Sequence, residues 1–458
     1  MPYIPHTEAE RDAMLKTVGV ESLDDLFVDI APDLRPKSFL ASAGLPEQEV
    51  RTLCEELAER NTRVLSFLGA GYYDHYIPAA VDALAGQSAF VTAYTPYQAE
   101  CSQGTLQAIF EFQTAIARLM ELDCANASLY DGGTALFEAC TMCVRQAKKR
   151  TKIVLDEGIN PIWRKMLETY ARNLPVEFVL VPLKDGAPDK EALKAAIDDE
   201  TAGVAVQNPN FFGVVEDYSD VFAHAKEKKA LSVISVNPVL LSVLKTPGAM
   251  GADIAVGEGQ PLGQPLDFGG PYLGLMACKK ALVRQMPGRL VGRTHDTQGR
   301  TGYVLTLQAR EQHIRRSKAT SNICSNQNLC ALRALVYLSL MGPQGLKDVA
   351  ENSIAMAHHA AREIVDQIEG ASLLNTAPFA NEVAIRLPVP ADVLVQRCLA
   401  RHKCVPGYPA GRDFKGMENV LVLACTERNT SGQVGILLDA MKDVIAWIGQ
   451  DELCQARG

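Results

Sequence analysis

The feature that most constrains the fold is an alternation of short apolar runs and amphipathic stretches between residues 70 and 320. The runs have the length of strands, and several are rich in Val and Ile. The predicted strands are 151–155, 176–181, 203–207, 231–236, 254–257 and 273–277, and the predicted helices are 160–173, 189–198 and 217–229. Such an alternation predicts right-handed crossovers and a mostly parallel sheet covered by helices.

The flanking regions indicate two further units. Residues 1–65 are charged, with apolar side chains at helical spacing, and we interpret them as an N-terminal helical arm. Residues 321–458 begin with a long helical segment, and the elements predicted there are a helix over 328–340, strands over 381–387 and 419–425, and a helix over 431–447. We therefore expect a large α/β domain over 66–320 and a small C-terminal α+β domain over 321–458. This is the layout of the aspartate-aminotransferase-like fold, which is fold type I of the pyridoxal phosphate enzymes.

A lysine is missing where this fold would need one. The strand over 254–257 runs into a Gly-rich turn, and in pyridoxal enzymes such a strand delivers the lysine that forms a Schiff base with the cofactor. No Lys or Arg lies between Lys245 and Lys279, and the turn offers Glu258 and Gln260 instead. A carboxamide cannot form a Schiff base, so the chain cannot hold the cofactor covalently there and a partner is implied.

A carboxylate is missing as well. The pyridine nitrogen of the cofactor normally pairs with an acid, which keeps the ring protonated and able to accept electrons. The strand over 231–236 should supply this acid, yet no Asp or Glu occurs from Leu231 through Lys245. Two independent requirements are unmet, which favours a degenerate cofactor site.

A Gly-Gly pair marks a candidate anion site. Asp131-Gly132-Gly133-Thr134 follows a short apolar run and precedes a predicted helix. Glycines allow close approach of a ligand to the backbone, and the free N–H groups of a helix start favour anions such as a phosphate. The alternative is a plain helix cap made by Asp131. We take Asp131, Gly132, Gly133, Thr134 and Gln260 as the degenerate site.

An aromatic loop is the second candidate region. Tyr94, Tyr97 and Gln98 crowd a Pro-containing turn that precedes an amphipathic helix with apolar positions from Leu106 to Met120. Hydroxyl groups on such a loop can point into a shared cleft. The alternative is a packed turn with buried rings.

Three other patterns carry less weight. Residues 308–322 are cationic and could bind a phosphate or an acidic partner surface, although a solvated helix face is the simpler interpretation. His295-Asp296 is a polar pair on an expected loop. Cys140 and Cys143 match C-x-x-C but lie in an apolar helix without a second pair, so we interpret them as core residues and expect no metal.

Composition excludes several classes of function. A net charge of -9 argues against a nucleic-acid-binding surface. The 12 cysteines are scattered, mostly in apolar surroundings, which fits a reducing, cytoplasmic compartment. The most apolar long run, 329–340, is short and contains Arg333, so we expect no membrane span.

Several long motifs together resemble the N-terminal half of the glycine cleavage system P-protein, glycine dehydrogenase (decarboxylating), which many prokaryotes make as a separate subunit 1. The similarity covers nearly the whole chain. The motifs that carry it are Tyr3-Ile4-Pro5, Phe67 to His75, Thr95-Pro96-Tyr97-Gln98 with Ser102-Gln103-Gly104, Gln207 to Gly213, and Arg310 to Arg316. One departure is Ala99, where many relatives have Pro.

The resemblance implies a function that explains both absences. In this family a second, homologous half carries the lysine and the pyridoxal phosphate, and the first half completes its active site. Glycine would lose carbon dioxide, and its aminomethyl group would pass to the lipoyl arm of H-protein. Tyr94, Tyr97 and Gln98 belong to the family's most distinctive motif, and we expect them to complete the partner's site. The implied assembly is a pair of heterodimers.

Two other functions remain open on the sequence. The chain could be a non-catalytic scaffold or regulatory subunit of a pyridoxal enzyme. It could also be a self-sufficient pyridoxal enzyme that uses Lys279 or Lys280, although both lie beyond the next predicted strand.

Overall fold

The computed structural model describes residues 6–36, 44–92, 94–267, 269–320, 323 and 326–455, with side chains described up to residue 449. The chain separates into two compact units, residues 1–62 and 63–458. The predicted boundaries at residues 65 and 320 remain predictions.

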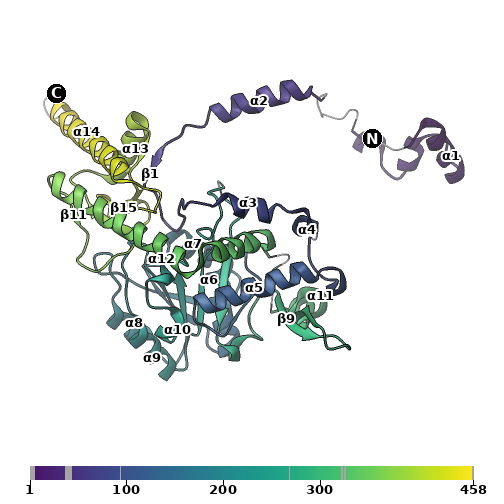
Figure 1. The fold of residues 1–458 in the computed structure, drawn as a ribbon, viewed down its shortest axis with the longest axis horizontal. Helices are drawn as coiled ribbons and strands as arrows, with labels where there is room; N and C mark the ends of the chain where they lie inside the picture. Colours follow the sequence, from purple (N-terminus) through teal and green to yellow (C-terminus); the bar gives the residue numbers. More distant parts are fainter. Residues whose placement is uncertain are drawn as a thin grey trace. The chain divides into compact units, whose positions relative to one another are not determined.

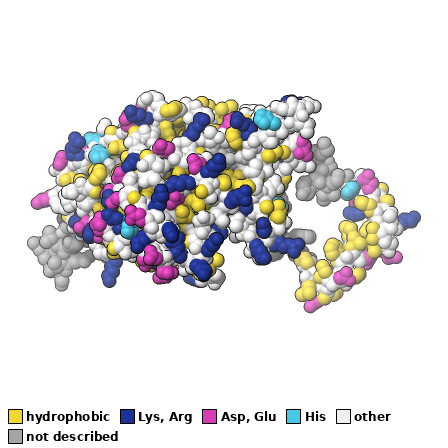
Figure 2. Space-filling view, turned by 90° about the horizontal axis from the view of Figure 1, so that it is seen from below, with side chains coloured by type: hydrophobic (Ala, Val, Ile, Leu, Met, Phe, Trp, Pro, Cys, Tyr) yellow, Lys and Arg dark blue, Asp and Glu magenta, His cyan; other side chains and the backbone are white. Residues whose placement is uncertain are grey.

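The first unit is helical and has no buried residue within its described parts. Its helices are α1 (Glu8–Val18), the 3-10 turns Leu23–Phe27 and Pro32–Leu34, and α2 (Glu47–Glu59). On α2, Val50, Leu53 and Leu57 share one face at helical spacing and are 42–48% exposed. Apolar side chains gather on the surface of this unit (Figure 2), so it presents apolar surface that it does not bury itself.

The second unit is built on a seven-stranded sheet in the order β2-β8-β7-β6-β5-β3-β4. Its strands are β2 (Cys124–Ala125), β3 (Lys152–Asp156), β4 (Glu177–Val181), β5 (Thr201–Asn208), β6 (Leu231–Val236), β7 (Ile254–Glu258) and β8 (Gly274–Cys278). The strands from β7 to β4 are parallel, whereas β8 runs antiparallel to both of its neighbours. The six predicted strands are therefore all present, and the mostly parallel sheet is confirmed.

Helices cover both faces of this sheet (Figure 1). The shorter helices between residues 79 and 315 are α3 (Ala79–Ala85), α4 (Ser88–Val91), α8 (Lys190–Ala196), α9 (Ser219–Glu227), α10 (Pro247–Met250) and α11 (Gln312–Arg315), and the longer ones are α5 (Gln103–Leu119), α6 (Gly132–Ala147) and α7 (Pro161–Ala171). One core holds residues of α5, α9 and the first part of α12, and a second core holds residues of α6 and α7. A hairpin, β9 (Leu290–His295) and β10 (Thr301–Thr306), was not expected; His295 ends its first strand, and Asp296 lies in its turn.

A four-stranded antiparallel sheet follows in the order β11-β12-β15-β14. Its strands are β11 (Ser372–Leu373), β12 (Glu382–Arg386), β14 (Tyr408–Pro409) and β15 (Val420–Ala424), and its helices are α13 (Ala391–His402) and α14 (Ser431–Gln455). The short strand β1 (Leu65–Ser66) pairs with β13 (Cys404–Val405). The predicted strands and closing helix are present.

The helix α12 (Asn328–Gln367) joins the two sheets and is longer than predicted. The chain breaks helical geometry only at Gly342, before Pro343, and then resumes the helix. By length and composition α12 is the one helix of the described chain that could cross a membrane. Its buried residues, such as Tyr337 and Ala357, lie in the cores of the second unit.

Candidate functional site

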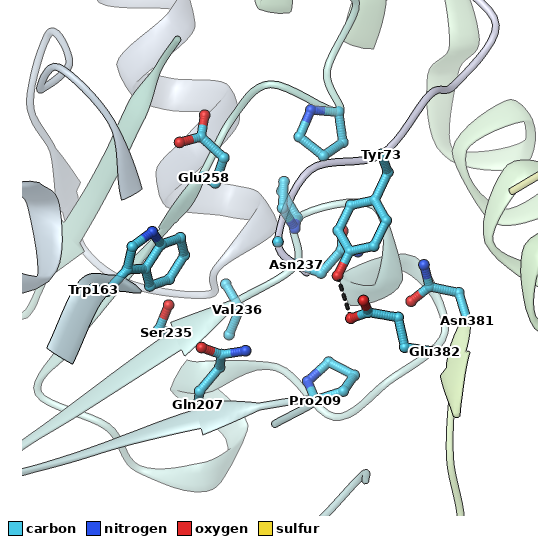
Figure 3. Close-up of a pocket in the computed structure, with 13 residues that line it drawn as sticks. Tyr73, Trp163, Gln207, Pro209, Ser235, Val236, Asn237, Glu258, Asn381 and Glu382 are labelled. Atoms are coloured by element: carbon cyan, nitrogen blue, oxygen red, sulfur yellow. Dashed lines mark hydrogen bonds between the residues drawn. The ribbon is translucent and has the colours of Figure 1, made fainter. Parts of the chain in front are cut away.

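A small pocket lies where the parallel strands end. Its volume is about 20 Å³, and it is lined from the large sheet by Gln207, Ser235 and Glu258, and from the C-terminal sheet by Asn381 and Glu382 (Figure 3). The carboxyl ends of parallel strands are where ligands of α/β proteins bind. This is therefore the position at which a fold type I enzyme would hold its cofactor.

The predicted anion cradle is filled by a side chain of the same protein. Asp131 caps α6 by accepting hydrogen bonds from the N–H and hydroxyl of Thr134, at 2.7 and 3.0 Å. The N–H of Gly132, the residue that follows Asp131, donates to Oε2 of Glu258 at 2.9 Å. Oε1 of Glu258 accepts from the N–H groups of Gln260 at 2.9 Å and Leu273 at 3.2 Å. The carboxyl group of Glu258 thus takes up one N–H of the helix start and two from the segments that follow β7 and precede β8.

The indole ring of Trp163 packs against Gly132 and Gly133. A Cβ on Gly132 would lie 2.9 Å from atoms of Trp163, and one on Gly133 would lie 2.9 Å from the same side chain. Both distances are too short for a real Cβ. The glycines are therefore needed here because Trp163, on α7, packs directly on the start of α6, and at Gly132 the backbone N of Glu258 would lie closer still to a Cβ, at 2.8 Å.

Gln260 and Glu382 hold the segment 70–73 beside the pocket through hydrogen bonds. The carboxamide of Gln260 donates to the carbonyl of Tyr73 and accepts from its N–H, both at 2.9 Å. The carboxyl group of Glu382 accepts from the Tyr73 hydroxyl at 2.5 Å and from the N–H of Ala70 at 2.7 Å. Tyr73 therefore links the turn after β7 to the first residue of β12 (Figure 3).

Burial makes the two pocket acids weak. It raises the pKa of Glu258 to about 8, although its three backbone donors act in the opposite direction. It raises the pKa of Glu382 to about 7, against the hydrogen bonds from Tyr73 and Ala70. Both groups titrate near neutral pH, which is unusual for carboxyl groups.

Pyridoxal phosphate does not fit these residues. Sites for small ligands measure about 300–1,000 Å³, whereas this pocket has the volume of about one water molecule. The residues that line it include no lysine, and β6 places Ser235 and Val236 where an acid would be needed. Lys279 lies beyond the opposite end of β7, where its ammonium group contacts Asp253 at 2.7 Å. This pocket therefore offers neither the space nor the groups that the cofactor needs.

The aromatic loop is directed to solvent. Tyr94 is 82% and Tyr97 is 55% exposed, and Gln98 is exposed as well. Two side chains contact Tyr97. Its hydroxyl accepts from Nη2 of Arg289 at 2.9 Å, and the same guanidinium lies 5.4 Å from the ring centre. The ring of His313 packs edge-on, with the ring centres 6.3 Å apart. Arg289 is 3% exposed and also donates to Asn326 at 3.3 Å. The polar side chains of the loop thus face solvent, and the buried Arg289 holds Tyr97 in place.

The other sequence patterns have structural explanations. Residues 308–318 form short helical turns, and Arg310 is buried, with Nη2 donating to the carbonyl of Gly288 at 3.1 Å. Ser321 and Asn322, which end the cationic segment, lie outside the described residues. Cys140 and Cys143 are buried free thiols in a core, as interpreted from the sequence. No group of three potential metal ligands occurs among the residues that the structure describes.

Comparison with known proteins places the chain in a family. A family model described as "Glycine cleavage system P-protein" matches residues 1–441. The chain belongs to this family. A relative from Nitratidesulfovibrio vulgaris (strain DSM 19637 / Miyazaki F), named "Probable glycine dehydrogenase (decarboxylating) subunit 1", is 62% identical over 446 residues, which cover 97% of this chain and 100% of the relative. The resemblance inferred from the motifs is confirmed, and so is the prediction of a glycine dehydrogenase subunit.

Solved structures agree with the fold. A structure of "glycine decarboxylase (P-protein) of the glycine cleavage system, in inhibitor-bound form" is 42% identical with a TM-score of 0.89, and the match covers 97% of this chain and 100% of that chain. A sphingosine-1-phosphate lyase of Burkholderia pseudomallei K96243 matches with a TM-score of 0.65 at 13% identity, over 93% of this chain and 97% of that one. The second match concerns the fold alone. Together they confirm fold type I.

Four residues of the site were not singled out from the sequence. Tyr73 lies in the motif 67–75, but its link to Glu382 spans 309 residues. Trp163 could have been suspected, because Gly-Gly at a helix start leaves room for a large neighbour. Arg289 follows Pro287-Gly288, and nothing nearby in the sequence indicates that its partner is Tyr97.

Proposed function

We propose that this chain is the subunit of glycine decarboxylase that carries no cofactor and that works only with a second, homologous subunit. The observation that carries the proposal is the filled pocket. A P-protein family member without lysine or space at its own cofactor position needs another chain to hold pyridoxal phosphate. The family depends on this cofactor, which supplies the electron sink for loss of carbon dioxide from glycine. In this proposal the aminomethyl group passes to the lipoyl arm of H-protein.

The contribution of this chain would be made at the partner's site. Tyr94, Tyr97 and Gln98 are exposed on a loop that ends at the rigid helix α5. Side chains placed in this way can orient a substrate and exclude water in a site shared with another chain. Arg289 is a positioning residue in this arrangement, because it holds the Tyr97 hydroxyl and supports the ring.

The N-terminal unit supports an obligate complex. Its described residues bury nothing among themselves, and the face of α2 formed by Val50, Leu53 and Leu57 is apolar. Such a face is stabilised when another surface covers it. We propose that the second subunit supplies part of that cover in a pair of heterodimers, with interfaces of the obligate class, larger than about 2,000 Å².

The remaining predictions on compartment and surface are consistent with this function. The described cysteines are free thiols, which supports a cytoplasmic enzyme. On the face drawn in Figure 2, basic side chains are interspersed with acidic ones. This favours protein and small-molecule partners over nucleic acid.

Reconstitution tests the proposal. This chain alone, the second subunit alone and their mixture should be compared for glycine-dependent exchange of carbon dioxide in the presence of H-protein. We expect exchange only in the mixture. A second subunit that exchanges carbon dioxide at the full rate alone would favour the alternative, a scaffold or regulatory role for this chain.

A further inference from the structure

Two glutamines of α5 hold the hairpin formed by β9 and β10. The carboxamide of Gln103 accepts from the N–H of Tyr303 and donates to the carbonyl of the same residue, both at 2.9 Å. The carboxamide of Gln113 makes the same pair of bonds with Val291, at 2.9 and 3.0 Å. The two strands form a sheet of their own, so each glutamine satisfies backbone groups at an outer edge. The hairpin is therefore fixed on α5, which contacts both of its strands (Figure 1).

Gln103 also contacts the aromatic loop, residues 94–102. Its Nε2 donates to the carbonyl of Ala99 at 2.6 Å, in addition to the bond with Tyr303. Gln103 is the first residue of α5, so one carboxamide joins the loop, the helix start and β10. Gln113 lies about 15 Å further along the helix, on the other edge of the hairpin.

The hairpin also supplies the second anchor of the loop. Arg289, whose guanidinium holds the Tyr97 hydroxyl, immediately precedes β9. The loop is therefore attached to the same hairpin at two points, at Tyr97 through Arg289 and at Ala99 through Gln103. Two points of attachment fix the direction of the segment between them as well as its position.

We propose that Gln103 is a positioning residue, whose carboxamide sets the orientation of Tyr97 and Gln98 for the partner's site. A carboxamide suits this position because it donates two hydrogen bonds to carbonyls and accepts one from an N–H at the same time. The expected effect on rate rests on the proposed function, whereas the attachment of the loop concerns this chain alone.

The first measurement is hydrogen–deuterium exchange of the full-length chain without its partner. Gln103→Met keeps the length of the side chain and removes all three hydrogen bonds. The N–H groups of Cys101 and Ser102 donate within the loop at 3.1 and 3.3 Å. In the variant they should exchange at least about tenfold faster than in wild type.

Gln113→Met is the matched control, because it removes the same kind of clamp from the other edge of the hairpin. It should speed hydrogen exchange at Val291 and leave the loop unchanged. The backbone of Arg289 stays in place in this control, since its carbonyl accepts from the N–H of Ala127 at 2.8 Å.

The second measurement is glycine-dependent carbon dioxide exchange in the reconstituted complex. Gln103→Met should lower kcat by about tenfold and change the KM for glycine by less than about twofold, because misplaced groups impair the reaction more than binding. If Gln103 acts through Tyr97, the same substitution should lower the rate of Tyr97→Phe by a smaller factor than the rate of wild type. A residue that only stabilises the fold would not show this dependence.

Three results would overturn the proposal. They are loop N–H groups that exchange at the wild-type rate in Gln103→Met, an equal loss of kcat in Gln113→Met, and a loss that multiplies fully with that of Tyr97→Phe. If Gln103→Met does not fold, Gln103→Glu carries the same tests. It can still accept from the N–H of Tyr303 but cannot donate, and a negative charge is favourable at a helix start.

Failure of the proposed function would be distinguishable from failure of this inference. A second subunit that is fully active alone would refute the shared site. Hydrogen exchange of the loop would still decide whether Gln103 holds it.

Discussion

Removal of the Tyr97 hydroxyl should separate a catalytic loop from a packed turn. In Tyr97→Phe the ring stays over the guanidinium of Arg289, and one hydrogen bond of 2.9 Å is lost. A hydrogen bond to a charged group contributes about 1.5–3 kcal/mol when buried. Tyr97 is 55% exposed, so water can replace the hydroxyl and the loss should be nearer 1 kcal/mol.

The expected effects on stability and on rate therefore differ. A loss of about 1 kcal/mol lowers the melting temperature of a chain this large by only about 1–2 °C. If the hydroxyl contacts the reacting groups in the partner's site, exchange should fall by about tenfold to a hundredfold, which corresponds to about 1.4–2.7 kcal/mol of transition-state stabilisation. Gln98→Ala should behave alike, with an even smaller effect on stability.

The assay is glycine-dependent carbon dioxide exchange in the reconstituted complex, with thermal unfolding and size-exclusion chromatography of the same samples. Tyr170→Phe is the matched control, because Tyr170 is 53% exposed on α7 and lies outside the loop; it should change neither quantity. Wild-type exchange in both Tyr97→Phe and Gln98→Ala would refute the assignment. Parallel losses of stability and rate would show that the loop is a packed turn.

Two further predictions concern assembly and pH. Leu53→Glu should weaken binding of the second subunit by more than about tenfold, because it places a charge on the apolar face of α2. Thr52→Glu, on the opposite face, should not weaken binding. Equal binding by both variants in sedimentation experiments would argue against the docking role of α2. The pKa of Glu382 is raised from 4.5 to about 7 in the folded chain, so between these pH values the folded state binds a proton that the unfolded state releases. The contribution of Glu382 to the free energy of unfolding, about 3 kcal/mol, is therefore lost as the pH rises from about 4.5 to about 7. Urea unfolding at about pH 5 and pH 8 should show a smaller decrease for Glu382→Gln than for wild type, and an equal decrease would contradict the raised pKa.

The sequence was sufficient for the parallel sheet because its strands are buried and continuous. β6 and β7 begin at the predicted residues, since runs such as Leu231–Val236 are buried on both faces and rich in Val, Ile and Leu. Helix ends were less predictable. Gly342 and Pro343 indicate a stop, yet α12 resumes, because both of its parts pack into cores. Tertiary packing outweighed the local propensity there.

The site was predictable in what it lacks and not in what fills it. The absence of lysine and acid can be read from local sequence, since each concerns one strand. The occupants come from distant parts of the chain: Gly132 meets Glu258 across 126 residues, and Arg289 meets Tyr97 across 192. The hairpin β9–β10 was missed because its first strand ends in polar Arg293 to His295, which are exposed and do not alternate with apolar residues.

The central claim is that catalysis needs this chain while the cofactor is held by another. The most direct measurement is borohydride reduction of the reconstituted, active complex, followed by mass mapping of both subunits. The account predicts a phosphopyridoxyl group on a lysine of the second subunit and none on this chain. The account would be contradicted by a phosphopyridoxyl group on any lysine of this chain, such as Lys279 or Lys280, at a yield that matches the activity.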